Sequence, residues 1–186
     1  MAYFYIILKL VSVVESMRFY KIPAGSLIPT IMAGDWIVTL KVWSTENLKR
    51  RDMIVFPFPP DPTINYIKRV IGLPGERLEI SKDLVFINGE IIDEPYAYFE
   101  PKERSSMQAK GLTDAVPVSR FGPIVIPEGK LFAMGDNRYN SADSRYWGFV
   151  DIKTVVGKGQ IIYWSHDPGE NFFGGYQLGR VFDLLK

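Results

Sequence analysis

Short apolar segments separated by polar turns recur along most of this chain. They are rich in β-branched and aromatic residues and are bounded by glycine and proline, a pattern typical of β-strands. After the amino terminus, no long stretch holds the period of an amphipathic helix. The pattern predicts an all-β fold of mainly antiparallel sheets, arranged as two sheets or an open barrel. The expected strands span residues 36–42, 53–56, 64–71, 78–80, 84–87, 123–126, 130–134 and 154–164.

The middle of the chain differs from its flanks. Asn88-Gly89 lies between two apolar runs and predicts a tight hairpin, because a type I′ turn needs positive φ at both central residues. From about Glu94 to Arg120 the sequence is polar and rich in turn residues, and its charges around 100–104 are typical of a solvated face. We therefore expect three parts: an apolar amino-terminal segment (1–18), a β core (19–80 and 123–186) and a small β insertion (81–122).

The amino-terminal segment predicts a short apolar helix. Residues 3–14 are interrupted by Lys9, and a helix that crosses a bilayer needs roughly 20 apolar residues. The segment also lacks the basic, apolar and small-residue layout of a cleaved signal peptide. Two interpretations stay open, a buried or interfacial amphipathic helix and the end of a transmembrane helix.

Composition removes several classes of function. The 186 residues suit one domain with a sizeable core, and the formal net charge of +1 gives no support for a nucleic-acid partner. Cysteine is absent, which excludes disulfides, a thiol nucleophile and cysteine-based zinc sites. The only histidine, His166, lies where an expected strand runs into a turn, and this place favours a structural role. We expect no metal and no cofactor.

Nucleophilic catalysis on this chain would therefore need a base other than histidine. Ser26 is the candidate nucleophile: Gly25 before it permits a tight turn, and Pro29 after it restricts the exit of that turn. Such a turn can expose the hydroxyl at a fixed angle and direct its backbone N–H at a developing oxyanion. An ordinary Pro/Gly/Ser loop has the same composition, so the segment alone decides nothing.

Lys68 lies inside an apolar expected strand. In an extended strand Tyr66, Lys68 and Val70 share one face, and such neighbours desolvate an amine and favour its neutral form. From about 10.4, the pKa must fall by roughly 2–3 units, at a cost of about 3–4 kcal/mol, for the lysine to act as a base near neutrality. The alternative is a strand lysine whose amine reaches water.

A dense polar loop from Gly135 to Arg145 follows the expected strand at 130–134. Its acids, bases, amides and hydroxyls can satisfy their own backbone and hold one shape. Asp143 with Arg145 predicts a charge-assisted pair that holds Ser141 near the lysine. A calcium-type turn is the alternative, although few acids are available for it.

Three segments together resemble the bacterial type I signal peptidases. The family's serine motif is similar to Ser26 through Thr30, followed by Gly34 through Val38. Its lysine motif is similar to residues 66–76, and its last motif to residues 135–145. The three occur in the family's order and cover most of residues 20–80 and 123–164, whereas residues 81–122 match only loosely.

The resemblance implies a membrane-associated serine endopeptidase that removes signal peptides from exported preproteins. Ser26 would attack the scissile carbonyl and Lys68 would take its proton, while Ser141 would orient the lysine amine. Asp143 with Arg145 would brace the loop. The substrate would add a strand to the sheet and place its A-x-A residues in small apolar pockets. The positions that match substrate-binding residues of the family are Tyr20, Ile22, Pro23, Leu27, Ile31, Ile37, Tyr66 and Ile67.

The chain departs from the family at three places. Leu27 stands where most members have methionine, which keeps an apolar pocket wall. Ala24 stands where many members have a serine whose hydroxyl completes the oxyanion hole beside the Ser26 backbone N–H. Losing one such donor can cost on the order of 10²–10³ in rate. Members have one or two membrane spans before the serine, and residues 1–18 are interpreted as the stub of one.

Membrane contact is also suggested by aromatic residues. They predict either an exposed apolar surface at a membrane interface or, equally, core packing. By the resemblance, the catalytic part would lie on the outer, periplasmic face of the bacterial cytoplasmic membrane. The expected partners are preproteins and the lipid surface of that membrane, with no nucleic acid. The aromatic residues in question are Trp36, Trp43, Trp164, Phe172 and Phe173.

Two other classes of function stay open. One is a self-cleaving regulator that couples a serine–lysine dyad to a DNA-binding domain, for which the chain shows neither a helix-turn-helix nor a basic face. The other is a non-catalytic β-domain that binds signal peptides or displays a membrane-facing surface. In that reading Ala24 would mark the loss of activity.

Overall fold

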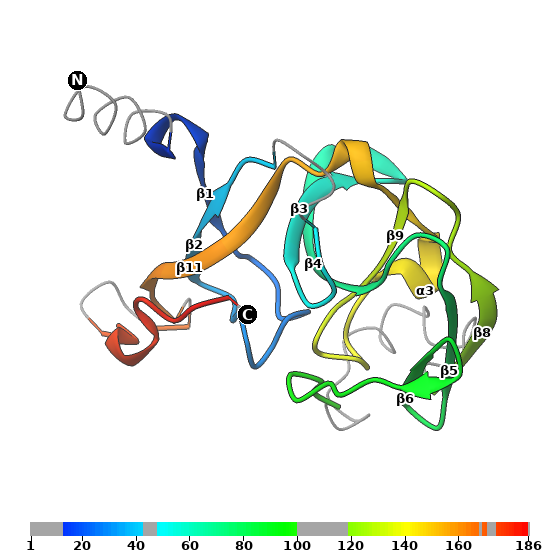
Figure 1. The fold of residues 1–186 in the computed structure, drawn as a ribbon. Coiled ribbons are helices and arrows are strands. Elements are labelled where there is room, and N and C mark those ends of the chain that lie inside the picture. Colours follow the sequence, from blue (N-terminus) through cyan, green and yellow to red (C-terminus); the bar gives the residue numbers. More distant parts are fainter. Residues whose placement is uncertain (1–12, 43–47, 100–118, 168, 171–173, 186) are drawn as a thin grey trace, which may run out of the picture.

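The strands lie in two antiparallel sheets (Figure 1). A computed structural model describes residues 13–42, 48–99, 119–167, 169–170 and 174–185. The strands are β1 (Met17–Lys21), β2 (Asp35–Leu40), β3 (Met53–Phe58), β4 (Asp61–Gly72), β5 (Arg77–Ser81), β6 (Leu84–Ile87), β7 (Glu90–Ile91), β8 (Arg120–Val125), β9 (Lys130–Met134), β10 (Val150–Asp151) and β11 (Gly157–Ser165). The larger sheet has the order β1-β2-β11-β3-β4-β9-β10, and the smaller sheet the order β7-β6-β5-β8. This architecture confirms the predicted all-β, mainly antiparallel fold.

Helical elements in the described residues are short. They are α3 (Ser144–Trp147), η3 (Ile152–Thr154), η4 (Leu178–Arg180) and a single turn at 13–16 before β1. None of them is long and apolar enough to cross a membrane. Residues 1–12, which make up most of the predicted amino-terminal helix, lie outside the described residues, so both interpretations of that segment stay predictions.

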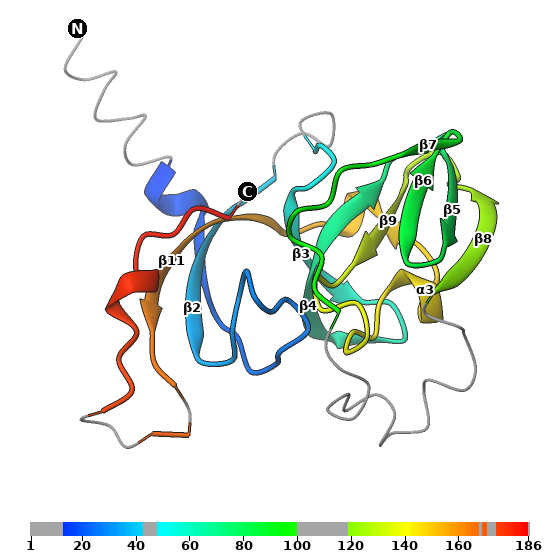
Figure 2. The same ribbon diagram turned by 90° about the horizontal axis from the view of Figure 1, so that it is seen from below.

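The larger sheet curls, and its strands β4 and β9 are covered on both faces (Figures 1 and 2). Neighbouring residues on these strands alternate between two hydrophobic cores. Val70 on β4 and Ala133 on β9 belong to one core, whereas Ile71 and Phe132 belong to the other. Only β9 and the second half of β4, from Lys68 to Gly72, are buried in this way, whereas residues 62–65 of β4 are exposed.

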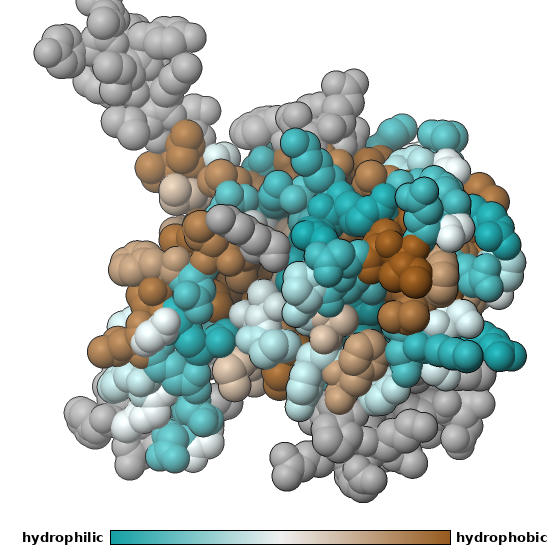
Figure 3. Space-filling view, turned by 60° about the horizontal axis from the view of Figure 1, so that its bottom comes forward, coloured by the Kyte–Doolittle hydropathy of each residue, from teal (hydrophilic) through white to brown (hydrophobic). Residues whose placement is uncertain are grey.

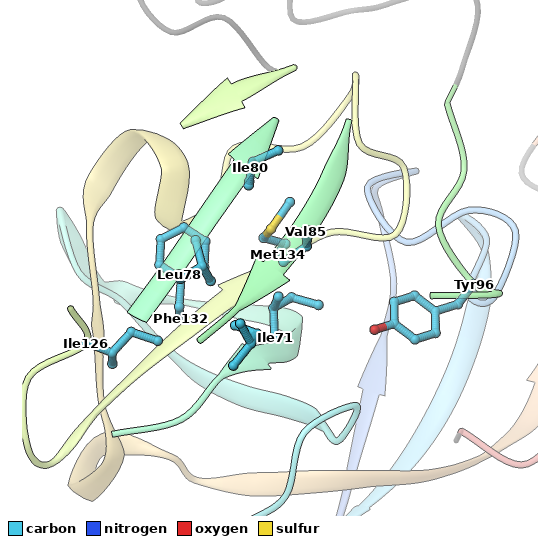
Figure 4. Close-up of a cluster of buried hydrophobic side chains, with 9 residues drawn as sticks. Ile71, Leu78, Ile80, Val85, Tyr96, Ile126, Phe132 and Met134 are labelled. Atoms are coloured by element: carbon cyan, nitrogen blue, oxygen red, sulfur yellow. The ribbon is translucent and has the colours of Figure 1, made fainter. Parts of the chain in front are cut away.

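The smaller sheet packs on the face of β4 and β9 that carries Ile71 and Phe132. Leu78 and Ile80 of β5 point into this shared core, which Figure 4 shows. Tyr96 lies at one end of the cluster, apart from the aliphatic side chains. The two sheets thus share one hydrophobic core.

The predicted limits of the insertion, residues 81 and 122, fall within the smaller sheet. Residue 81 ends β5 and residue 122 lies in β8, and these two strands pair with each other. Residues 100–118, including the charged cluster at 100–104, lie outside the described residues. The division into a β core and an insertion at 81–122 stays a prediction.

The predicted hairpin at Asn88-Gly89 is confirmed. It joins β6 to β7, and the two residues have φ values of 53° and 87°. Positive φ at both positions is what a type I′ turn requires.

Three strands differ from the sequence-based expectation: β1 and β10 were not expected, and β11 begins later than expected. β1 (Met17–Lys21) lies across the predicted boundary between the amino-terminal segment (1–18) and the β core, where no strand was expected. The strand expected at 154–164 begins instead at Gly157. Asp151 accepts a hydrogen bond from the Lys153 backbone N–H (2.9 Å) and thereby caps η3, so Thr154, the first residue of the expected strand, is helical instead.

The chain after β11 folds back along that strand. The Phe182 N–H donates to the Ile162 carbonyl (2.7 Å), and the Leu185 N–H donates to the Gln160 carbonyl (2.9 Å). The Leu185 side chain enters a third hydrophobic core, which also contains Leu27. The carboxyl-terminal segment is therefore packed against the part of the chain that carries Ser26.

Candidate active site

Ser26 and Lys68 come into direct contact. Ser26 begins the turn between β1 and β2, and Lys68 lies in β4 opposite Ile54 of β3. The Lys68 Nζ atom is 2.7 Å from the Ser26 Oγ atom, although the two residues are 42 positions apart in the sequence. A hydrogen bond of this length is the geometry that a nucleophile and its general base require.

The Lys68 side chain is only 4 % exposed. Burial removes water from the amine and lowers the pKa of Lys68 from 10.5 to about 8. Asp143 opposes this fall, Arg145 reinforces it, and Asp136 opposes it. The centroid of the Tyr66 ring lies 5.2 Å from the Lys68 Nζ atom, so the ring is next to the amine. Near pH 8, a large fraction of the amine is therefore neutral.

The polar loop after β9 holds the serine turn in place. The Asn137 backbone N–H donates to the Ser26 carbonyl (3.1 Å), and Asn137 Nδ2 donates to the Gly25 carbonyl (3.3 Å). Gly135 permits this close approach, because a β-carbon there would collide with the Ser26 carbonyl oxygen and the Ser141 hydroxyl. The Ser141 hydroxyl is buried against the same glycine as the serine turn, but it makes no hydrogen bond with Lys68 in the structure.

Asp143 and Arg145 form a buried two-point ion pair within this loop. Arg145 Nε is 2.8 Å from Asp143 Oδ1, and Arg145 Nη2 is 2.7 Å from Oδ2. Asp143 also accepts from the Gly135 N–H (3.0 Å), and Arg145 donates to the Arg138 carbonyl (2.8 Å). Burial alone would raise the pKa of Asp143, but Arg145 and these hydrogen bonds hold it below its usual value. The predicted charge-assisted pair is present.

A second buried ion pair joins β4 to the same loop, and sequence analysis missed it. Arg69 Nε and Nη2 each lie 2.7 Å from an Asp136 carboxylate oxygen, and the Thr30 hydroxyl donates to Asp136 (2.6 Å). The Arg69 guanidinium also lies 4.0 Å from the centroid of the Tyr96 ring. The available signal was Arg69 directly after Lys68 in an apolar strand, since a buried arginine needs an anionic partner.

Residues 94–99 bind the loop from the side of the smaller sheet. Arg138 pairs with Glu94 at 2.6 and 3.0 Å, and both side chains are buried. The Tyr98 N–H donates to the Asp136 carbonyl (2.7 Å), and the Arg138 N–H donates to the Tyr98 carbonyl (2.8 Å). Sequence analysis treated this region as a polar connection, whereas its first residues hold the loop.

Ser26 and Lys68 line a cavity of ≈ 410 Å³. Of the predicted substrate-binding residues, six line it: Tyr20, Ile22, Pro23, Leu27, Tyr66 and Ile67. Ile31 and Ile37 do not, because both are fully buried in the hydrophobic core behind Leu27. The cavity also takes in residues that the sequence did not single out as substrate-binding: Lys21, Val55, Ile64, Asn65, Asn140 and Ala142.

Two unpaired strand edges lie beside this cavity. Among the described residues, β1 pairs only with β2, and β9 pairs with β4 only from Arg69 onward. The edge of β4 around Tyr66 and Ile67 therefore has no second strand partner in that part of the chain. Free edges of this kind can accept an extended peptide through backbone hydrogen bonds.

The Ser26 backbone N–H is available to a ligand. In the part of the chain that the structure describes, no protein group accepts a hydrogen bond from it. Ala24 is exposed in the cavity wall two residues before Ser26. An added hydroxyl at position 24 would therefore have room.

His166 lies away from this constellation. Its backbone N–H donates to the Gly34 carbonyl (3.4 Å), its ring packs 5.2 Å from that of Tyr176, and it does not line the cavity. The polar loop shows no calcium-type arrangement, because Asp136 and Asp143 each face an arginine. Within the described ranges, no three or more of histidine, cysteine and acidic residues are grouped to hold a metal ion.

Comparison with known proteins places these features in a family. A family model described as "Signal peptidase, peptidase S26" matches residues 1–164. The chain belongs to this signal peptidase family. "Signal peptidase I" of Bacillus caldolyticus is 35% identical over 146 residues, which is 78% of each chain. "Signal peptidase IB" of Staphylococcus aureus (strain COL) is 35% identical over 161 residues, covering 83% of this chain and 81% of that protein.

A solved structure of a signal peptidase I from Enterococcus faecalis V583 is also similar. It is 33% identical in sequence, with a TM-score of 0.45, and the match covers 62% of this chain and 98% of that one. As a member of the signal peptidase family, the chain is a peptidase. The family match includes Ser26, Lys68 and the loop at 135–145, and it ends before residues 165–186.

Gly135→Ala tests the close approach between the loop and the serine turn. The new β-carbon would push apart the Ser26 carbonyl and the Ser141 hydroxyl, so we expect a loss of about 1–3 kcal/mol in unfolding free energy and of about tenfold or more in peptidase activity. Urea unfolding and an activity assay on the folded protein measure the two effects. Gly179→Ala is the matched control, since nothing lies within 4 Å of its added β-carbon. Equal behaviour of the two variants would contradict the prediction.

Proposed function

We propose that this chain removes amino-terminal signal peptides from exported preproteins through a serine–lysine dyad. The observation that carries the proposal is the 2.7 Å contact between Lys68 Nζ and Ser26 Oγ beside a cavity. A lysine whose pKa falls to about 8 can serve as a base without any histidine. The substrate class comes from the relatives named signal peptidase I.

The dyad works by moving one proton between Ser26 and the leaving group. Neutral Lys68 takes the hydroxyl proton as Ser26 Oγ attacks the scissile carbonyl carbon. The tetrahedral intermediate collapses when the lysine ammonium gives that proton to the leaving amine nitrogen, which leaves an acyl ester on Ser26. Water then attacks the ester, with the lysine amine again as the base, and the signal peptide leaves.

The surrounding loop holds the base in position. In this proposal the Ser141 hydroxyl, which is buried against Gly135 beside the serine turn, orients the Lys68 amine during the reaction, although the two groups make no hydrogen bond in the structure. The Asp143–Arg145 pair fixes the backbone on either side of that serine. All three residues act by positioning and make no bond to the substrate.

The signal peptide binds as an extended strand between the free edges of β1 and β4. Ile22, Leu27, Tyr66 and Ile67 all line the cavity. These side chains suit the small residues of an A-x-A site. The two isoleucines buried behind Leu27 support the wall without contacting the peptide.

The oxyanion of the tetrahedral intermediate receives the Ser26 backbone N–H. This donor has no protein acceptor among the described residues and lies in the residue that makes the new bond. Ala24 cannot donate a second hydrogen bond from its side chain. The site therefore works with one fewer side-chain donor than relatives that have serine at this position.

The peptidase works at a lipid surface in this proposal, on the outer, periplasmic face of the bacterial cytoplasmic membrane. Apolar side chains on β1, β11 and the carboxyl-terminal segment are exposed: Phe19, Trp164, Leu178, Phe182 and Leu184. Figure 3 shows apolar surface on the left of this view. Trp36 is half-buried, and Trp43, Phe172 and Phe173 lie outside the described residues. An apolar surface of this kind suits a membrane interface.

Substitution of the dyad tests the reaction. With a preprotein that carries an A-x-A site, we expect Lys68→Met and Ser26→Ala each to lower kcat/KM by about 10⁴-fold or more, because each removes one half of the proton transfer. Lys153→Met, which removes an exposed lysine, is the matched control. Thermal unfolding shows whether each variant is folded. Undiminished cleavage by folded Lys68→Met would disprove the dyad, and binding without cleavage by the native chain would favour a non-catalytic domain.

The pH dependence of the same assay follows from the pKa of Lys68. Only the neutral amine accepts the serine proton, so kcat/KM rises with pH through about 8 and levels off above that value. A fall across this range would contradict Lys68 as the base.

Ala24→Ser tests the oxyanion site. The position is exposed in the cavity wall, so the new hydroxyl fits and adds a donor for the oxyanion. We expect single-turnover kcat to stay unchanged or to rise, by at most about 10²-fold. Ala142→Ser, also in the cavity wall, is the comparison variant. A large fall in kcat for Ala24→Ser would show that the oxyanion is held differently.

Membrane contact is tested by removing apolar surface. In a vesicle co-sedimentation assay with phosphatidylethanolamine and phosphatidylglycerol, we expect Leu178→Ser with Phe182→Ser to weaken binding about tenfold, because both side chains are more than two-thirds exposed. Leu84→Ser with Val125→Ser, on the smaller sheet, is the matched control and should bind as the native chain does. An equal loss in both double variants would argue against this surface.

A further inference from the structure

Arg180 in the carboxyl-terminal segment reaches the turn that carries Ser26. Its Nη2 atom lies 2.6 Å from Asp35 Oδ2 and 3.1 Å from the Thr30 carbonyl oxygen. Its Nη1 atom lies 3.5 Å from the Pro29 carbonyl oxygen, and its Nε atom lies 3.4 Å from Asp35 Oδ1. One planar guanidinium thus binds two backbone carbonyls and a carboxylate, over a sequence distance of 145 residues to the latter.

These contacts hold both ends of the segment between Ser26 and β2: Arg180 binds the end of the serine turn and the first residue of β2. The carbonyls of Pro29 and Thr30 end the turn that begins at Ser26, where the Ile31 N–H donates to the Leu27 carbonyl (2.9 Å). Carbonyls at the end of such a turn lack partners within it, and a cation there satisfies them.

Asp35 lies at the other end of this segment, as the first residue of β2. Its carboxylate is fully buried and also accepts from the Met32 N–H (2.8 Å). A buried carboxylate without a positive partner is costly, and Arg180 supplies that partner. Arg180 therefore locks the end of the serine turn to the start of β2.

The opposite side of the turn is held by the polar loop. There, the Asn137 N–H donates to the Ser26 carbonyl and the Thr30 hydroxyl donates to Asp136. Thr30 is therefore bound on two sides. Its hydroxyl donates to Asp136 of the loop, and its carbonyl accepts a hydrogen bond from Arg180. Without Arg180, the loop would hold only one side of the turn.

The carboxyl-terminal segment that carries Arg180 is itself held in place. Backbone hydrogen bonds from Phe182 to Ile162 and from Leu185 to Gln160 fix it along β11. The Leu185 side chain packs in the core that also contains Leu27.

We infer that Arg180 is a positioning residue for the nucleophile: through Asp35 and the carbonyls of residues 29 and 30, it holds Ser26 Oγ at hydrogen-bond distance from Lys68. The inference rests on the proposed function and extends it to residues 165–186, which lie beyond the family match. Arg180 itself does not line the cavity and touches no reacting atom.

The test compares Arg180→Met, Arg180→Lys and the native full chain on the A-x-A preprotein. For Arg180→Met we expect kcat to fall by about 10–100-fold with KM within about twofold, because a displaced nucleophile slows the chemical step while the binding cavity keeps its walls. Lysine keeps the charge but loses the planar fork, so Arg180→Lys should restore part of kcat. The pH midpoint should stay near that of the native chain, since the burial of Lys68 is unchanged.

Hydrogen exchange gives a readout that does not depend on catalysis. The amides of residues 26–35 should exchange at least about tenfold faster in Arg180→Met, while those of β9 should be unchanged. Arg77→Met, which removes an exposed arginine on the smaller sheet, is the control for both assays.

Each outcome bears on the inference. Native-like kcat in Arg180→Met, a loss confined to KM, or a uniform increase of exchange across the whole chain would overturn it. If the native chain cleaves no preprotein, the proposed function fails, and the exchange of residues 26–35 still decides whether Arg180 holds the turn.

Discussion

The hydrogen bond between Lys68 and Ser26 places a lysine amine in a buried site, and the proposed role of Lys68 as a base requires this amine to lose its proton there. Taking the amine out of water lowers its pKa from 10.5 to about 8, which corresponds to about 3 kcal/mol of differential stability between the two protonation states. The folded protein must make up this cost elsewhere. Burial of Lys68 on β4, between hydrophobic cores that cover both faces of the strand, is therefore the constraint on which the site depends.

Burial has a larger effect on the pKa of Lys68 than the charged groups around its amine. Two carboxylates lie near Lys68, and either would favour the ammonium form if it stood alone. Asp143 is paired with Arg145 and Asp136 with Arg69, each through two short contacts. Arg145 lowers the pKa of Lys68 and so opposes the effect of the two carboxylates, while burial has the largest effect on that pKa.

The turn that carries Ser26, the proposed nucleophile, is held by parts of the chain that lie far apart in sequence. The loop after β9 binds the Ser26 turn from one side, and Glu94 fixes that loop through Arg138. Arg180 binds the turn from the other side. The segment after β7, which contains Glu94, and the carboxyl-terminal segment thus both support the turn that carries Ser26.

The sequence by itself determined the elements and the candidate chemistry. These features are local: the strand periodicity, the Asn88-Gly89 turn and the residue types around Ser26 and Lys68. Each can be identified from neighbouring residues in the sequence, without knowing the fold. The pairing of Asp143 with Arg145 was predictable for the same reason, because the two residues are neighbours in one loop.

Only the tertiary structure decided which distant groups meet. Arg69 and Asp136 are 67 residues apart, and Arg180 and Asp35 are 145 apart, so nothing in the local sequence selects one partner over another. Ile31, expected in the substrate pocket, lies behind its wall, because the apolar character of a residue does not say which side of a turn faces solvent. The degree to which Lys68 is desolvated likewise depends on packing from both faces of β4, and packing is a property of the folded chain alone.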